Sequence, residues 1–196
     1  MTNDEFWFSA QRGSRVKKFP AETLCSDKNK RSRDYLRMSW FGSRVARLFG
    51  QKLPAFSSLT EAEAYLFAQR DERLRRITEL AASSDNFAAD YTPESLKNLE
   101  RWYFELMDTN GFQPLGISRE GFECCMASYF CELAVRNCRD VKWEVREFEF
   151  AHGKFEIGVQ RGLLHFMLNR FTDHHKQPNN KRRQKIYRMY QERFAG

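Results

Sequence analysis

Two adjacent histidines are the residues in this 196-residue sequence best placed to do chemistry. His174 and His175 follow Asp173 and precede Lys176, and three more basic residues stand at 181–183. Neighbouring imidazoles cannot easily face one tetrahedral metal ion, and no further ligand at a zinc-site spacing accompanies them. The sequence therefore predicts no metal site and no cofactor. The segment suits contacts with phosphate groups better, because it combines positive charge with hydrogen-bonding side chains.

The cysteines are the second candidates for chemistry. Four of the five fall between Cys124 and Cys138, in a stretch that we predict to be helical, without any C-x-x-C pair. An odd count on one element is not a disulfide framework. Spacings of seven place Cys124, Cys131 and Cys138 on one stripe, where cysteine packs as a small apolar residue. His152 or His165 could approach these thiols in the fold, but no local signature of a thiol enzyme accompanies them. We therefore expect core cysteines and predict no catalytic residue.

Basic charge is concentrated in two blocks near the ends of the chain. Residues 11–54 hold twelve Lys or Arg against three acidic residues, and residues 174–196 hold seven against one. The stretch between them, 55–173, has fourteen basic and twenty acidic residues. This asymmetry predicts an anionic partner without naming it.

The basic blocks contain the candidate binding residues. In the first block arginines alternate with aromatic residues, a pattern that single-stranded nucleic-acid surfaces use and that protein hot spots share. In the second block, the tyrosines could stack on bases, or they could simply dock a solvated terminal helix on the core. Composition leaves these alternatives open. The candidate nucleic-acid or partner-binding residues are Arg31, Arg33, Arg37, Trp40, Arg44, Arg47, Lys176, Lys181, Arg182, Arg183, Lys185 and Arg188.

The composition is that of a folded chain, with 41% apolar and 15% aromatic residues. We expect a basic N-terminal extension over 1–54 and a single domain over 55–196. No segment approaches the roughly 18 consecutive apolar residues of a membrane span. The N-terminus also lacks the basic-then-apolar order of a secretory signal. We therefore expect a cytoplasmic protein without a membrane partner, while its oligomeric state stays open.

Helix signals recur along the predicted domain. Thr60 opens a capping box and a run rich in Ala, Leu, Glu and Arg, which predicts a helix over 61–82. Thr92 as N-cap, with Pro93 in the first turn, predicts a second helix over 93–109. Ser118 caps a third predicted helix over 119–138. A basic amphipathic helix over 181–194 closes the chain.

A β-hairpin separates the third and last helices. Val141, Trp143 and Val145 alternate with charged residues, and alternation resumes after Gly153, which predicts a hairpin over 141–159. Residues 163–171 fit either another strand or a short helix. We expect an α+β fold whose second and third helices pack on a small antiparallel sheet built around this hairpin. The helix over 61–82 and the basic N-terminal arm should lie outside that unit.

One carboxylate of the third helix stands beside its apolar face. Glu132 is followed one turn later by Arg136, so we expect the two side chains to pair. A pair of hydrolytic carboxylates among the glutamates of the hairpin is a further alternative, but strands expose charged faces routinely. No glycine-rich phosphate loop is present in the sequence.

From about Thr92 to Phe194 the order of elements resembles small bacterial domains of unknown function. In these domains a helix with a Tyr-x-Gly-Glu-type motif leads into a Trp-bearing β-hairpin, and some relatives are immunity-type, partner-binding proteins. The residues that carry the resemblance are Tyr129, Glu132, Arg136, Asn137 and Trp143, while Cys131 stands where the pattern has glycine. The resemblance implies partner binding and no catalytic residue.

Together these observations predict a non-catalytic protein that docks an acidic macromolecule, nucleic acid or acidic protein, through its basic N- and C-terminal segments. The alternative is an immunity-type or adaptor protein that binds one specific protein partner. An enzyme stays open as a third class.

Overall fold

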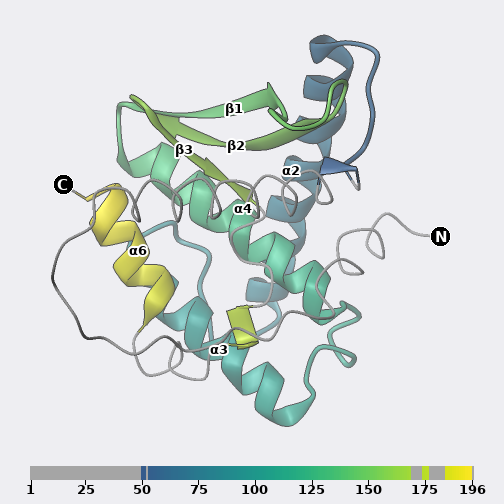
Figure 1. The fold of residues 1–196 in the computed structure, drawn as a ribbon. Helices are drawn as coiled ribbons and strands as arrows, with labels where there is room; N and C mark the ends of the chain where they lie inside the picture. Colours follow the sequence, from purple (N-terminus) through teal and green to yellow (C-terminus); the bar gives the residue numbers. More distant parts are fainter. Residues whose placement is uncertain (1–49, 52, 169–173, 177–183, 196) are drawn as a thin grey trace, which may run out of the picture. The chain divides into compact units, whose positions relative to one another are not determined.

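The computed structural model describes residues 50–51, 53–168, 174–176 and 184–195. Its elements, in chain order, are α2 (Leu59–Ala82), α3 (Ser95–Thr109), α4 (Arg119–Asn137), β1 (Val141–Glu147), β2 (Phe155–Arg161), β3 (Leu164–Met167), the 3-10 turn η3 (His174–Lys176) and α6 (Lys185–Arg193) (Figure 1). The predicted α+β class is confirmed. Among the described residues, no helix is long and apolar enough to cross a bilayer.

The chain divides into two compact units, one of residues 1–56 with 147–155 and one of residues 57–146 with 156–196. In the first unit, Ala55 and Lys154 form an isolated antiparallel bridge. The Lys154 ammonium donates to the Leu53 carbonyl at 2.6 Å, and the rings of Phe56 and Phe155 meet edge to face. Since residues 1–49 lie outside the described part, the predicted domain boundary after Pro54 stays a prediction.

In the second unit, α2 begins at Leu59, two residues before the predicted start at Glu61. Ser58 is the N-cap, and its hydroxyl accepts from the Glu61 backbone N–H at 3.2 Å. Glu61 also accepts from the backbone N–H of Ser57, the residue before the N-cap, at 2.8 Å, so the reciprocal bond of a capping box is displaced by one residue. Serine is as good an N-cap as threonine, so the sequence identified the type of signal but placed it on Thr60.

The prediction that α2 lies outside the helix–sheet unit is wrong. Ile77, Leu80 and Ala81 belong to the same buried cluster as the residues of α3 and α4, and α2 packs along α4. The buried stripe of α2 includes small residues such as Ala62. Small side chains bury little area each and give a weak apolar pattern in the sequence, which is why the charged face of α2 dominated the prediction.

α3 begins at Ser95, three residues after the predicted cap. Thr92 instead forms a turn before the helix, with its carbonyl accepting from both the N–H and the hydroxyl of Ser95. α3 ends at Thr109, and the left-handed backbone of its C-cap Asn110 lets the Gly111 N–H bond the Leu106 carbonyl. The predicted cap of α4 is confirmed, because the Ser118 hydroxyl accepts from the Gly121 N–H at 2.9 Å.

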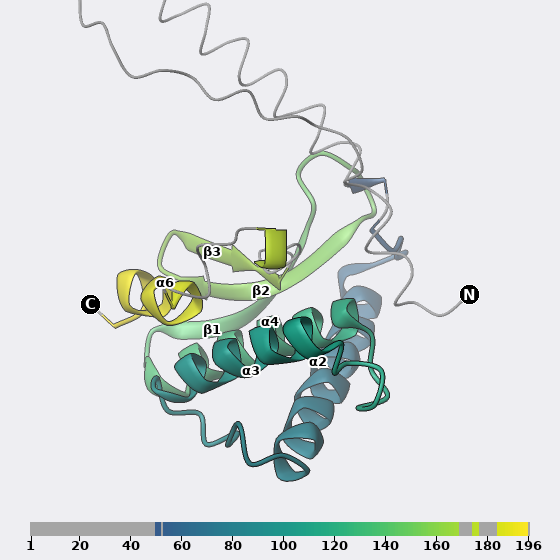
Figure 2. The ribbon, with the colours of Figure 1, turned by 90° about the horizontal axis from the view of Figure 1, so that it is seen from below.

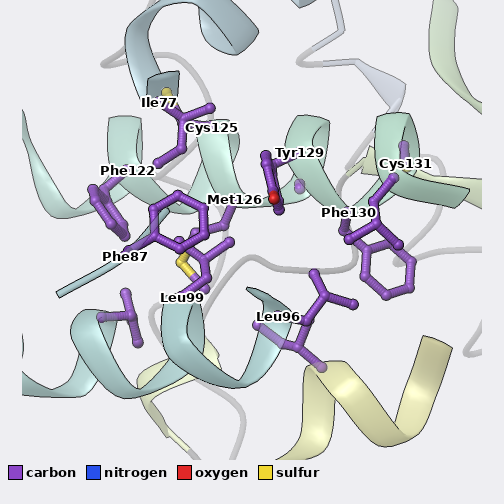
Figure 3. Packing of buried hydrophobic residues seen from close by; sticks show 14 of the residues in the cluster. Ile77, Phe87, Leu96, Leu99, Phe122, Cys125, Met126, Tyr129, Phe130 and Cys131 are labelled. Atoms are coloured by element: carbon purple, nitrogen blue, oxygen red, sulfur yellow. The ribbon is translucent and has the colours of Figure 1, made fainter. Parts of the chain in front are cut away.

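α4 is the centre of the core. Phe122, Met126, Tyr129 and Phe130 are completely or almost completely buried, and they face side chains of α2, α3 and the loop at Phe87 (Figure 3). The strands form a layer on one side of α3 and α4 (Figure 2). Because neighbours surround α4 on several sides, its apolar residues spread around the helix instead of forming one stripe.

The cysteines of α4 pack differently from the predicted stripe. Cys125 and Cys131 are buried, whereas Cys124 and Cys138 are partly buried, and within the described residues none of the four forms a disulfide. Burial raises the pKa of the Cys131 thiol well above its usual value, with a smaller effect from the Glu132 carboxylate. A core role therefore holds for Cys131 and partly for Cys138, which packs against the cluster, while Cys125 replaces Cys124.

The sheet has the order β1-β2-β3, so the predicted hairpin is confirmed and residues 164–167 form a strand. β2 and β3 are antiparallel with Val159 opposite Phe166. At Gly158 a Cβ atom would lie 2.2 Å from the Phe166 carbonyl oxygen, so this position accepts no side chain without a shift of the backbone. Phe166 packs on Phe130 of α4, with ring centroids 5.0 Å apart.

α6 closes the core from the C-terminal side. It buries Ile186 and Tyr190, and Phe194 just beyond its end packs on Phe130. The predicted helix over 181–194 thus corresponds to α6, while residues 181–183 lie outside the described part.

Candidate functional site

The structure describes three of the twelve predicted binding residues. Lys176 is exposed at the end of η3, Lys185 is partly buried in the first turn of α6, and Arg188 is 60% exposed and lies 4.0 Å from Glu192. The remaining nine lie outside the described residues: Arg31, Arg33, Arg37, Trp40, Arg44, Arg47, Lys181, Arg182 and Arg183. Binding of a partner through the two basic blocks therefore stays a prediction.

The excess positive charge does not reside in the described residues. Of the formal charge of +7, residues 1–49 hold +6, residues 177–183 hold +3 and Lys52 holds +1, while residues 169–173 are neutral, so the described residues carry −3. The basic character of the chain thus belongs to residues outside the described part, mainly 1–49 and 177–183, whereas the described residues are mildly acidic.

The His174–His175 pair lies on two buried carboxylates. His174 Nε2 lies 2.8 Å from Glu100 Oε1, and these side chains are 5% and 2% exposed. The other oxygen of Glu100 accepts from the backbone N–H of Ile186 at 3.2 Å. The rings of Tyr103 and Phe104 flank the His174 imidazole. One carboxylate on α3 therefore joins three segments, namely α3, η3 and the start of α6.

His175 contacts a carboxylate on a different helix. Its Nδ1 lies 3.2 Å from Glu123 Oε1 on α4, and the Tyr103 hydroxyl donates to the same oxygen at 2.5 Å. Arg119 Nε stands 3.9 Å from it. Burial, followed by the negative charge of Glu123, raises the pKa of Tyr103 well above its usual value. Tyr103 therefore remains a hydrogen-bond donor in the folded protein, and η3 is held by two helices.

This arrangement bears on the predicted C-terminal site. The adjacent histidines point to separate carboxylates, and among the described residues no group of three or more His, Cys, Asp or Glu is placed to hold a metal ion. Residues on both sides of 177–183 meet the Glu100 carboxylate, His174 before the segment and Ile186 after it. The described ends of this basic segment are thus anchored to one point of the core.

Sequence reasoning missed Glu100 and Glu123. Glu100 lies between Leu99 and Tyr103 on the buried stripe of α3, and Glu123 follows the buried Phe122 on α4. A carboxylate on an apolar stripe requires a partner, because its desolvation is costly. The sequence could therefore have indicated that Glu100 and Glu123 need partners, and His174 and His175, which had no assigned role, are residues that can pair with carboxylates.

A second polar cluster surrounds Glu132. Arg136 Nε donates to Glu132 Oε1 at 2.8 Å, which confirms the predicted pair. Glu132 Oε2 accepts from the indole N–H of Trp143 on β1 at 2.9 Å. The guanidinium of Arg70 on α2 lies 4.6 Å from the ring centroid of Phe67 and 5.2 Å from that of Trp143. This cluster links α2, α4 and β1.

Tyr91 adjoins the Glu132 cluster and has an unusual backbone. Its φ of +58° lies in the left-handed region, which is unfavourable for a bulky side chain. The Tyr129 hydroxyl accepts from its N–H at 2.9 Å, and Asn137 donates to its carbonyl at 2.8 Å. Its ring stacks on the Tyr129 ring, and the Arg136 guanidinium lies over the Tyr91 ring with its Cζ 3.6 Å from the centroid. Tyr91 was missed because its partners are about 40 residues away.

With this geometry described, the chain can be compared with known proteins. The model of the family described as "Uncharacterised protein YwmA" matches residues 55–194. The chain belongs to the YwmA family. A relative from Bacillus subtilis (strain 168), described as "Uncharacterized protein YwmA", is 26% identical over 113 residues, which cover 58% of this chain and 71% of the relative. No solved structure matches the chain.

YwmA family membership agrees with the coarser part of the predicted resemblance, that to small bacterial domains without an assigned activity. The family match covers both carboxylate clusters, since Glu100, Glu123 and Glu132 all fall within residues 55–194. Neither the family description nor that of the Bacillus subtilis relative names a ligand or a partner.

Proposed function

We propose that this YwmA family protein is a non-catalytic binding protein that docks an acidic macromolecule through its basic segments. The observation that carries the proposal is the partition of charge, since the described residues hold −3 while residues 1–49 and 177–183 hold +6 and +3. A basic segment beside an acidic body attracts an anionic partner to one place on the molecule.

Anchoring at Glu100 supports the C-terminal segment as part of this surface. His174 and Ile186 hold the described residues on both sides of 177–183 to one buried carboxylate. Binding costs less when less conformational freedom is lost. A basic segment with anchored ends therefore binds an anion more favourably than a free tail of the same composition.

The partner under this proposal is a nucleic acid or an acidic protein, and the compartment is the cytoplasm. Both partner classes present repeated negative charges, which Lys181, Arg182 and Arg183 would neutralise. Affinity for nucleic acid should fall log-linearly with salt, because bound phosphates release counterions. An immunity-type or adaptor protein, in contrast, forms a one-to-one complex that survives moderate salt.

The test measures binding of a labelled single-stranded oligonucleotide, and separately of an acidic protein, over a series of salt concentrations. The substitutions Lys181→Ala, Arg182→Ala and Arg183→Ala are combined in one variant. The control variant carries Arg73→Ala, Arg101→Ala and Lys142→Ala and loses the same charge from the body.

If the segment contacts single-stranded nucleic acid, the first variant should lose affinity. Its salt slope should fall by about 2, at about 0.7 for each lost phosphate contact, while the control retains the wild-type slope. Equal losses in both variants would show that net charge, rather than this segment, drives binding. Unchanged binding in the first variant would remove the segment from the proposed surface.

A further inference from the structure

The Arg136 side chain is fixed in place but has unused hydrogen-bonding capacity. Its Nε donates to Glu132 at 2.8 Å, and its Cζ lies 3.6 Å above the centre of the Tyr91 ring. The side chain is nevertheless 52% exposed. Within the described part of the chain, neither terminal nitrogen of Arg136 has a hydrogen-bond partner. The two nitrogens that form the outer edge of the guanidinium are thus available to a ligand.

Tyr91 holds the plane of this guanidinium. Tyr129 and Arg136 are seven residues apart on α4, so two helical turns, about 10 Å, separate them on the same side of the helix. The Tyr91 ring stacks on Tyr129, with centroids 4.8 Å apart, and on Arg136, so it fills the space between them. The left-handed backbone of Tyr91 is held by Tyr129 and Asn137. These contacts hold Tyr91 in its unfavourable backbone conformation, and the Tyr91 ring in turn fixes the exposed Arg136 guanidinium.

Trp143 stands next to this arginine. Its indole N–H and Arg136 Nε bind the two oxygens of one carboxylate, that of Glu132. On the Trp143 side, Arg70 lies against the rings of Trp143 and Phe67. The exposed arginine therefore borders a patch of half-buried aromatic rings from α2 and β1. Arginine, tryptophan and tyrosine are the residue types that dominate protein binding hot spots.

We propose that Arg136 is a receptor for the carboxylate of an Asp or Glu side chain in a partner protein. A guanidinium with two parallel N–H donors matches a carboxylate in a bidentate geometry. Stacking on Tyr91 and the bond to Glu132 fix this geometry before the ligand arrives, which lowers the entropy cost of binding. Trp143 and the adjoining rings supply the apolar contact area beside the ion pair.

The charges around Arg136 favour a singly charged carboxylate over a phosphate. Glu132 already neutralises the positive charge of Arg136, and Asp90 lies next to Tyr91 in the chain, so the receptor has no surplus of positive charge. A phosphate group with about two negative charges would be repelled by Glu132 more strongly than a singly charged carboxylate. A partner that brings one carboxylate and an apolar neighbour therefore fits best.

This site is separate from the basic segments and does not depend on the proposed function. Arg136 belongs to the described body, whereas the predicted nucleic-acid contacts lie at 31–47 and 176–188. Either proposal can fail while the other holds, and the variant with Lys181, Arg182 and Arg183 replaced by Ala should retain the Arg136 site.

The test follows the side-chain N–H signals of Arg136 and Trp143 by nuclear magnetic resonance in the isotope-labelled full chain. The probes are a capped Ala-Asp-Leu peptide, which brings one carboxylate and an apolar neighbour, and inorganic phosphate at the same ionic strength. We expect the peptide to shift both signals together and to saturate, while phosphate leaves them in place. Arg136→Lys keeps the positive charge but lacks the two parallel N–H donors of the guanidinium, and should weaken peptide binding about tenfold. Arg101→Lys, an exposed change on α3, should leave it unaltered.

Three results would overturn the proposal. One is the absence of a saturable shift with the peptide, and another is equal peptide affinity in the wild type and the Arg136→Lys variant. The third is tighter binding of phosphate than of the peptide, which would make the site a phosphate receptor. An unchanged near-ultraviolet circular dichroism spectrum shows that Arg136→Lys is folded.

Discussion

Replacing Glu100 by Gln tests whether one buried carboxylate holds the C-terminal part of the fold. The substitution keeps the volume of the side chain but removes its charge, and one acceptor oxygen becomes an NH2 group. The amide oxygen can accept from only one of the two partners, His174 Nε2 and the Ile186 N–H, which lie 2.8 and 3.2 Å from the native carboxylate oxygens, and both bonds lose their charged acceptor. Because hydrogen bonds to charged groups are worth about 1.5–3 kcal/mol, we expect a loss of about 2–3 kcal/mol in the free energy of unfolding.

Urea denaturation followed by tryptophan fluorescence measures this loss. In a chain of 196 residues, a loss of about 2–3 kcal/mol corresponds to a fall in Tm of about 4–12 °C. Glu105→Gln, on an exposed position of the same helix, is the matched control and should be within about 0.5 kcal/mol of wild type. Glu100→Ala removes both acceptor oxygens and should cost more, about 3–5 kcal/mol.

A double-mutant cycle isolates the pair. Combining Glu100→Gln with His174→Gln should give a coupling energy of about 1–3 kcal/mol, because the two side chains are in direct contact. Hydrogen exchange of the Ile186 amide should also be faster in Glu100→Gln than in Glu105→Gln. A coupling energy near zero, or equal destabilisation by Glu100→Gln and Glu105→Gln, would refute the role of Glu100 as the anchor.

Three further predictions concern the core. Gly158→Ala should destabilise the chain by about 1–3 kcal/mol in thermal unfolding, since its Cβ would lie 2.2 Å from the Phe166 carbonyl oxygen, whereas Gly162→Asn, in open space with a tolerated left-handed backbone, should change it little. Burial raises the pKa of Tyr129 to about 12. The pKa of Tyr129 in the folded chain therefore exceeds its unfolded value of about 10, so its contribution to stability is complete below pH 10 and is lost as the pH rises towards 12. Phenolate absorbance measures this ionisation. Ionisation of all described tyrosines near their ordinary pKa would contradict the prediction. The buried Cys131 thiol, whose pKa is raised, should react with a maleimide no faster than the chain unfolds; labelling in the native state would show that this part of α4 opens.

Local signals in the sequence identified most elements of the fold. Ser118 caps α4, and the alternation around Trp143 gives β1, because these signals act within a few residues. The start of α3 was misplaced because Thr92 bonds Ser95 in a turn before the helix, a pattern that resembles a cap in sequence. The position of α2 could not be predicted, since a stripe that includes small residues does not show which neighbour covers it.

The candidate site was predictable only in part. Glu132 and Arg136 are one helical turn apart, so their pairing follows from the sequence. Glu100 and His174 are 74 residues apart, and nothing local indicates that they meet. The sequence showed an unexplained pair of histidines but could not show that buried carboxylates on two helices receive them.

The measurement that tests the central claim most directly is affinity capture with the tagged full chain, with and without nuclease and at two salt concentrations. The account predicts that the wild-type chain retains an anionic macromolecule at low salt. This macromolecule should dissociate from the chain at high salt, and the variant with Lys181, Arg182 and Arg183 replaced by Ala should not retain it. Capture of the same partner by this variant, or retention of a neutral or basic partner at both salt concentrations, would contradict the proposal that the basic segments bind an acidic macromolecule.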